Sequence, residues 1–166
     1  MKLNKYSFLL FGLLVLGILF PYHSISQNIE IKNRIETISV YDYEAIFSSN
    51  EKKDLEETIL KFKRLTPKEI LIVTTNSIGP MNDMREYTVY LRDVYTKDTD
   101  NNEIVLIAIS KTLRRIAIST SDKSRQIVSD KLCDEIINQK MIPEFTKGNF
   151  FVGTRNGLDE LSMVWK

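Results

Sequence analysis

The stretch KDTDNNEIVLIAISKTLRRIAISTS, Lys97 to Ser121, joins an acidic turn to the most strand-like sequence of the chain. Residues 104–109 within it are an unbroken apolar run of strand length, which predicts a central strand covered on both faces. Residues 115–120 then alternate between two faces, as a second strand would. Together they predict a hairpin, and the acidic turn lies at its entrance, where loops of layered domains commonly carry function.

Outward from the hairpin, helical and strand patterns alternate along a chain of 166 residues, which is long enough for one domain with a sizeable core. Ser48 and Glu51 have the spacing of a capping box at the start of a helix. The alternation predicts an α/β fold. The expected elements are an edge strand at 37–40, a helix from 48 to 64, a strand at 69–75, a helix ending near 95, a helix over 124–139 and a last helix to 165.

The beginning of the chain has the pattern of a signal peptide. Lys2 and Lys5 precede an apolar run over 8–20, and Pro21 and the small-residue pattern over 24–26 follow it. The run is shorter than the roughly 20 residues of a spanning helix, so the pattern disfavours an uncleaved membrane anchor. We therefore expect cleavage after Ser26, export to the periplasm or the cell exterior, and a single domain over 27–166.

Loss of this segment would exclude several classes of function. The chain's single histidine, His23, would leave with it, and without histidine there is no Ser-His-Asp or Cys-His mechanism and no His-containing zinc site. Removal of Lys2 and Lys5 from 23 basic residues leaves 21 against 22 acidic residues, a formal net charge of −1, which disfavours nucleic-acid binding. The lone Cys133 lies in a helical pattern and is expected to be a half-buried apolar residue.

The acidic turn leaves two interpretations open. It begins like an EF-hand loop, but the required glycine and the final glutamate are replaced by Glu103 and Ile109, which excludes that motif. A different oxygen-rich site would bind calcium, or magnesium, which both prefer oxygen ligands. The other interpretation is a solvated turn, which Asp and Asn favour by bonding their own backbone. The candidate ligands are Asp42, Asp100, Asn101 and Asp130.

Arg114 and Arg115 also have two interpretations. Guanidinium groups can clamp a phosphate, but charged residues more often protect the exposed edge of a sheet, and we favour the second. The chain contains no glycine-rich loop that would cradle a phosphate, so nucleotide binding has no support.

Three stretches resemble the TPM domain family, which includes a thylakoid-lumen acid phosphatase and many exported bacterial proteins. They are VYDYEAIFSSNEKKDLE over 40–56, DNNEIVLIAI over 100–109 and IPEFTKGNFFVG over 142–153. The resemblance implies a three-layer α/β/α sandwich with a small, mostly four-stranded central sheet. It also implies an acidic loop site that binds a divalent cation in some relatives.

Carried over by position, the family's acidic residues match Asp42 before the first helix, the turn at 100–102 or one residue later, and Asp130 after the hairpin. The chain departs from the family pattern where the turn glycine is replaced by Asn102 or Glu103. Left-handed backbone suits Asn better than Glu, which changes the expected shape of the loop. The family's glycines after the hairpin are also replaced, by the residues over 119–122.

The resemblance leads to two functional hypotheses. The first is an exported domain that binds a divalent cation, with weak hydrolysis of a phosphate-containing small molecule in which the metal would activate a water. The second is a non-enzymatic accessory module that docks a protein or membrane partner of the cell envelope. We expect a monomer in either case, and the sequence assigns no catalytic residue.

Overall fold

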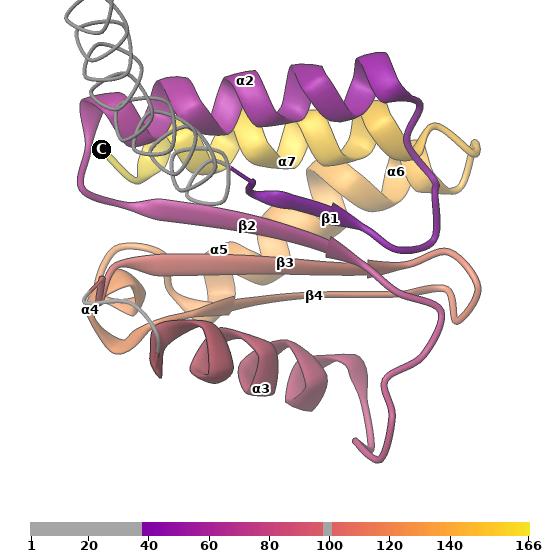
Figure 1. Ribbon diagram of the computed structural model, residues 1–166, viewed down its shortest axis with the longest axis horizontal. Helices are drawn as coiled ribbons and strands as arrows, with labels where there is room; N and C mark the ends of the chain where they lie inside the picture. The colour runs from indigo at the N-terminus through magenta and orange to yellow at the C-terminus, as the bar shows by residue number, and fades with distance from the viewer. Residues whose placement is uncertain (1–37, 98–100) are drawn as a thin grey trace, which may run out of the picture. The chain divides into compact units, whose positions relative to one another are not determined.

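The computed structural model describes residues 38–97 and 101–166, and a four-stranded sheet lies at the centre of this part of the chain (Figure 1). The strands follow one another in the order β1-β2-β3-β4. The first three are parallel, and β4 pairs antiparallel with β3, so the predicted hairpin is confirmed. Their bounds are β1 Val40–Asp42, β2 Glu69–Thr74, β3 Ile104–Ser110 and β4 Arg115–Thr120.

The two central strands are buried along their whole length. Their side chains alternate between two core clusters: Ile70 and Ile72 belong to one, and Leu71 and Val73 to the other. Successive side chains of a strand point to opposite faces, so each cluster marks one face of the sheet. A continuous apolar run is what a strand covered on both faces requires, as the sequence predicts.

Helices cover both faces and make three layers, which confirms the predicted α/β/α sandwich. Helix α2, Ser49–Leu65, and helix α7, Phe150–Val164, contribute to the first cluster, and helix α3, Met84–Lys97, contributes to the second. The predicted capping box is present at the start of α2, where Ser48 and Glu51 bond each other's backbone N–H. Its apolar side then packs on the sheet.

Two predicted elements differ from the structure. The edge strand begins at Val40 instead of ending there. The predicted helix over 124–139 is interrupted, because the Ser129 side chain accepts a hydrogen bond from Leu132 N–H and starts a new helix. The segment consists of α4 Asp122–Arg125, α5 Asp130–Ile136 and the π-helix η1 Ile137–Met141.

The glycines near the end of the chain have two different functions. Gly148 has a φ of 84° and lies in the turn between the short helix α6, Ile142–Phe145, and α7. Gly153 and Gly157 of α7 instead allow close approach to η1. A Cβ atom on Gly153 would lie 2.6 Å from the Phe145 ring and 2.8 Å from the Met141 carbonyl oxygen.

Residues Ser39–Lys166 form one compact unit. In the part of the chain that the structure describes, no helix has both the length and the apolar character to cross a membrane. The predicted signal peptide over 1–26 lies outside the described residues.

Candidate functional site

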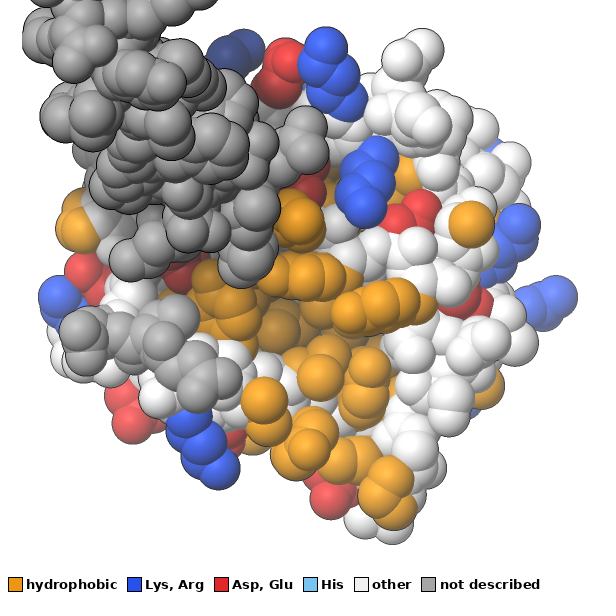
Figure 2. Space-filling view, viewed as in Figure 1, with side chains coloured by type: hydrophobic (Ala, Val, Ile, Leu, Met, Phe, Trp, Pro, Cys, Tyr) orange, Lys and Arg blue, Asp and Glu red, His pale blue; other side chains and the backbone are white. Residues whose placement is uncertain are grey.

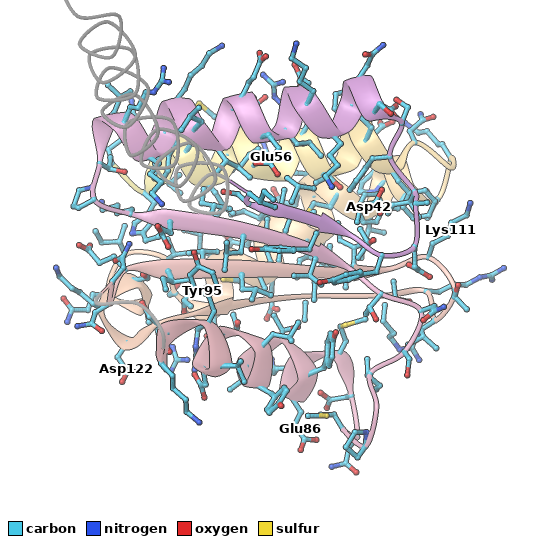
Figure 3. All side chains as sticks on the ribbon, in the orientation of Figure 1. Asp42, Glu56, Glu86, Tyr95, Lys111 and Asp122 are labelled. Atoms are coloured by element: carbon cyan, nitrogen blue, oxygen red, sulfur yellow. The ribbon has the colours of Figure 1, made fainter. Side chains whose placement is uncertain are left out.

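Asp42, the first predicted ligand, ends β1, and its carboxylate holds the loop that leads into α2 (Figure 3). Oδ1 accepts hydrogen bonds from Ile46 N–H at 3.1 Å and from the Thr74 hydroxyl at 2.5 Å. Oδ2 accepts one from Phe47 N–H at 2.9 Å. Both oxygens are therefore already used by the chain itself, in a loop where Ala45 has a φ of 51°.

The neighbouring carboxylate of Glu44 has a similar structural function. It accepts hydrogen bonds from Lys111 N–H at 2.8 Å and from Thr112 N–H at 3.0 Å, both in the β3–β4 turn. The Lys111 ammonium in turn lies 5.7 Å from the centre of the Phe150 ring. The two acidic residues that follow β1 thus connect loops at one end of the sheet.

Asn101 lies at the opposite end of the sheet. Its Oδ1 accepts a hydrogen bond from Glu103 N–H at 2.9 Å, and its Nδ2 donates to the Pro67 carbonyl at 3.1 Å. This is the local side-chain bonding that favours Asn in turns. Asp98 and Asp100, the acidic residues before it, lie outside the described residues.

Asp130 is the first residue of α5 and is half exposed. Its carboxylate lies 3.6 Å from Arg85 of α3 and 3.7 Å from Arg125 of α4, and Asp134 lies 3.9 Å from Arg85. Exposed ion pairs of this kind contribute at most about 1 kcal/mol to stability. Asp130 therefore belongs to a charged cluster at the surface.

The structure does not bring Asp42, Asn101 and Asp130 together. Asp42 pairs with Thr74 at the end of β2, whereas Asn101 lies near Glu69 at the beginning of the same strand. Thr74 is five residues from Glu69, which is about 17 Å along a strand. Asp130 begins α5, and its carboxylate is paired with Arg85 and Arg125. Within 38–97 and 101–166, no three His, Cys, Asp or Glu residues are grouped to hold a metal ion. These three residues do not fit one shared cation.

A polar cleft of about 390 Å³ lies where β3 begins and β4 ends. Lys123 forms an ion pair of 2.8 Å with Glu103, and Arg92 donates to Asp93 and, at 2.6 Å, to the Thr120 carbonyl. Asp122, whose side chain is exposed, also lines this cleft (Figure 3). In the sequence, the replaced family glycines at 119–122 indicate one side of this cleft. No feature of the sequence indicates that α3 forms the other side. The cleft is lined by Arg92, Asp93, Thr96, Asn102, Ser121, Asp122 and Lys123.

A second cavity, the tyrosine groove, has a volume of about 340 Å³ and lies between the open face of β1 and β2 and the side of α3. Figure 2 shows apolar side chains gathered over this part of the surface. None of its nine lining residues is charged. The lining residues are Tyr41, Tyr43, Leu71, Val73, Tyr87, Leu91, Val94, Tyr95 and Leu106.

Two phenols of the tyrosine groove, those of Tyr41 and Tyr95, have a raised pKa. Burial, followed by the nearby Glu69 carboxylate and its hydrogen bond, raises the pKa of Tyr95, whose hydroxyl donates to Glu69 at 3.0 Å. Burial also raises the pKa of Tyr41, with smaller contributions from Tyr43, Glu56 and Glu69. The rings of Tyr41 and Tyr43 stack with centres 6.4 Å apart. The groove therefore presents a neutral surface with aromatic walls.

The lone cysteine is not part of either cavity. Cys133 is 2% exposed, and burial, assisted by Asp130 and Asp134, raises the pKa of its thiol to about 12. The thiol therefore stays protonated and unreactive near neutral pH, as expected of an apolar core residue.

Comparison with known proteins identifies one family and several similar folds. The family model described as the TPM domain matches residues 40–164, whereas no curated protein matches the chain. The N-terminal domain of a protein from P. gingivalis has a TM-score of 0.70 and 24% identity, over 77% of this chain and 82% of that one.

Two further solution structures have the same fold. The N-terminal domain of the cg2496 protein from Corynebacterium glutamicum has a TM-score of 0.62 at 15% identity, over 77% of this chain and 80% of that one. The BA42 protein from Bizionia argentinensis has a TM-score of 0.62 at 21% identity, over 75% of this chain and 88% of that one. At such identities the likeness establishes the fold alone.

Proposed function

This chain belongs to the TPM domain family, and we propose that it acts as an exported, non-catalytic interaction domain of the cell envelope. The tyrosine groove is the observation that carries this proposal. It is apolar and uncharged, and Tyr43 at its rim is 73% exposed. Exposed aromatic side chains around an apolar hollow are typical of surfaces that bind other molecules.

The charged residues support the same proposal. Asp42 and Glu44 bond backbone N–H groups of their own chain, and Asp130 pairs with two arginines. A general acid or base needs a carboxylate directed at a substrate, and these are directed at the protein.

A photoreactive residue in the tyrosine groove tests the proposal. A benzophenone amino acid at Tyr43 should give a discrete cross-linked product in cells that export the protein. The matched control places the same amino acid at Met163 of α7, which is 58% exposed and lies on the other face of the sheet. Identical products from both positions, or none from Tyr43, would contradict an interaction at the groove.

Divalent-cation binding is the second candidate, and Asp122 in the polar cleft favours it. Its exposed carboxylate lines the cleft together with Asn102, which follows the predicted ligands Asp100 and Asn101 in the sequence. Calcium, or magnesium, would suit this set of oxygen donors. Arg92 and Lys123 of the same cleft would attract a phosphate-containing molecule.

Titration with calcium and with magnesium tests this candidate. Binding should shift amide NMR signals around Asn102 and Asp122 and raise the melting temperature, since a ligand of the folded state stabilises it. Asp122→Asn should weaken both effects, whereas Asp159→Asn, an exposed position of α7, should not. Hydrolysis of p-nitrophenyl phosphate that needs the cation and Asp122 would favour an enzyme over an interaction domain.

A further inference from the structure

One layer of the sandwich is incomplete in the part of the chain that the structure describes. Helices α2 and α7 both pack on one face of the sheet, but the other face carries only α3, which lies over β3 and β4 (Figure 1). The tyrosine groove is what remains open over β1 and β2.

The open area has the width of one helix. Neighbouring strands are about 4.8 Å apart, so the midline of β1 and β2 lies about 10 Å from the midline of β3 and β4. Packed helices have axes about 8–10 Å apart. A helix placed over β1 and β2 would therefore contact the sheet and the side of α3 together.

Helix α3 presents a stripe of apolar residues to this space. Tyr87, Leu91 and Val94 line the groove with the spacing i, i+4, i+7, which follows one side of a helix. They lie beside the residues Met84 and Thr88, which are buried against the sheet. A helix that contacts only the sheet and solvent needs one apolar side. Helix α3 has a second apolar side, next to the one that packs on the sheet.

The beginning of the β1 edge is covered by a side chain of α2. The Glu56 carboxylate of α2 accepts hydrogen bonds from Ser39 N–H at 3.0 Å and from Val40 N–H at 2.8 Å (Figure 3). An added strand would have to displace it from these backbone groups. Binding on the face of the sheet breaks neither of these hydrogen bonds.

We propose that the tyrosine groove receives one amphipathic α-helix of a partner protein, which lies beside α3 across β1 and β2. The inference rests on the proposed function and names the partner's structure. Because no lining residue is charged, the contacting side of the partner helix is apolar. It carries apolar residues at positions i, i+3 or i+4 and i+7.

Two displayed peptide libraries provide the probe. One contains helix-forming sequences of 14 residues, the length of α3, and the other contains sequences of the same length with prolines that prevent a helix. We expect enrichment from the first library only, with the apolar spacing given above. NMR shifts of a labelled enriched peptide should become helical on binding.

Two groove variants and one control define the site. Val94→Glu and Tyr43→Ser alter residues that are 40% and 73% exposed, so both proteins should fold with little change in melting temperature. Val94→Glu should weaken peptide binding by about tenfold or more, because it buries a charge in an apolar contact. Met163→Glu, at an exposed site of α7, should leave binding unchanged.

The outcomes separate this inference from the proposed function. Proline-containing peptides that bind and are weakened by Val94→Glu would overturn the helix and keep the interaction groove. Peptides indifferent to both groove variants would overturn both proposals. A dimer in sedimentation that Val94→Glu dissociates would put a second copy in the groove, and a failure to enrich any peptide would mean that the groove takes no such helix.

Discussion

Glu56 lies at the edge of the sheet beside β1, where its carboxylate accepts hydrogen bonds from the backbone N–H groups of Ser39 and Val40. Glu56→Ala should lower the free energy of unfolding by about 1–3 kcal/mol, since it leaves two backbone donors without their acceptor. Denaturant unfolding measures the change. Glu57→Ala, which removes only a 3.9 Å surface ion pair with Lys53, should change it by less than about 0.5 kcal/mol, and equal losses would contradict this assignment.

Cys133 should behave as a core side chain whose ionisation opposes folding. Its pKa is raised from 9.0 to about 12, so the neutral thiol's contribution to stability is present below pH 9 and is lost as the pH rises toward 12. The free energy of unfolding should therefore fall over this range, and less so in Cys133→Val. At pH 8 a thiol reagent should modify the folded protein far more slowly than the denatured protein, and equal rates would show an exposed thiol.

At the scale of single residues, the sequence predicted positions better than contacts. The burial of Cys133 could be predicted from helical spacing, and Asp42 could be placed before the first helix. The hydrogen bond between Asp42 and Thr74 could not be predicted, because Thr74 is distant in sequence and reaches Asp42 only through the pairing of β1 with β2.

At the scale of elements, the contact of α7 with η1 depends on Gly153. Gly153→Ala should lower the free energy of unfolding by about 1–3 kcal/mol although alanine favours helices, because the new methyl group meets the Met141 carbonyl. Gly157→Ala is the matched comparison. There the new methyl would meet only the Met141 side chain, which can move, so the loss should be smaller. Thermal unfolding compares the two, and a larger loss at Gly157 would contradict the packing described.

The elements that the sequence predicted well are those with a strong local signal. The apolar run over 104–109 and the capping box at Ser48 each correspond to an observed element. The helix over 124–139 was wrong because its apolar spacing continues through a break. The chain departs from a regular α-helix at the Ser129 cap and again at the five-residue π-helix. The last residue of the π-helix, Met141, packs against α7, and this contact cannot be read from local spacing.

At the scale of the whole molecule, Trp165 reports on the entire first core cluster. It is the chain's single tryptophan, is fully buried, and lies 5.6 Å from the Phe62 ring and 5.5 Å from the Lys68 ammonium. Unfolding followed by tryptophan fluorescence and by far-ultraviolet circular dichroism should therefore give coincident transitions. A fluorescence transition at lower denaturant would mean that the end of the chain separates from the core before the sheet unfolds.

The candidate site was the part least accessible to the sequence, for a reason of topology. The spacing of Asp42, Asn101 and Asp130 along the chain does not reveal how the strands pair, and that pairing places Asp42 and Asn101 at opposite ends of the sheet. The tyrosine groove was missed for the same reason, since β1, β2 and α3 supply its walls from segments far apart in sequence.

The place of Trp165 in the core also bears on when the protein can fold during its synthesis. Replacing a buried tryptophan by alanine typically costs about 3–5 kcal/mol, a large share of the about 5–15 kcal/mol of a whole domain. A growing chain that has emerged as far as α7 still lacks this side chain between α2 and the sheet. The domain therefore reaches its full stability only after residue 165 has left the ribosome.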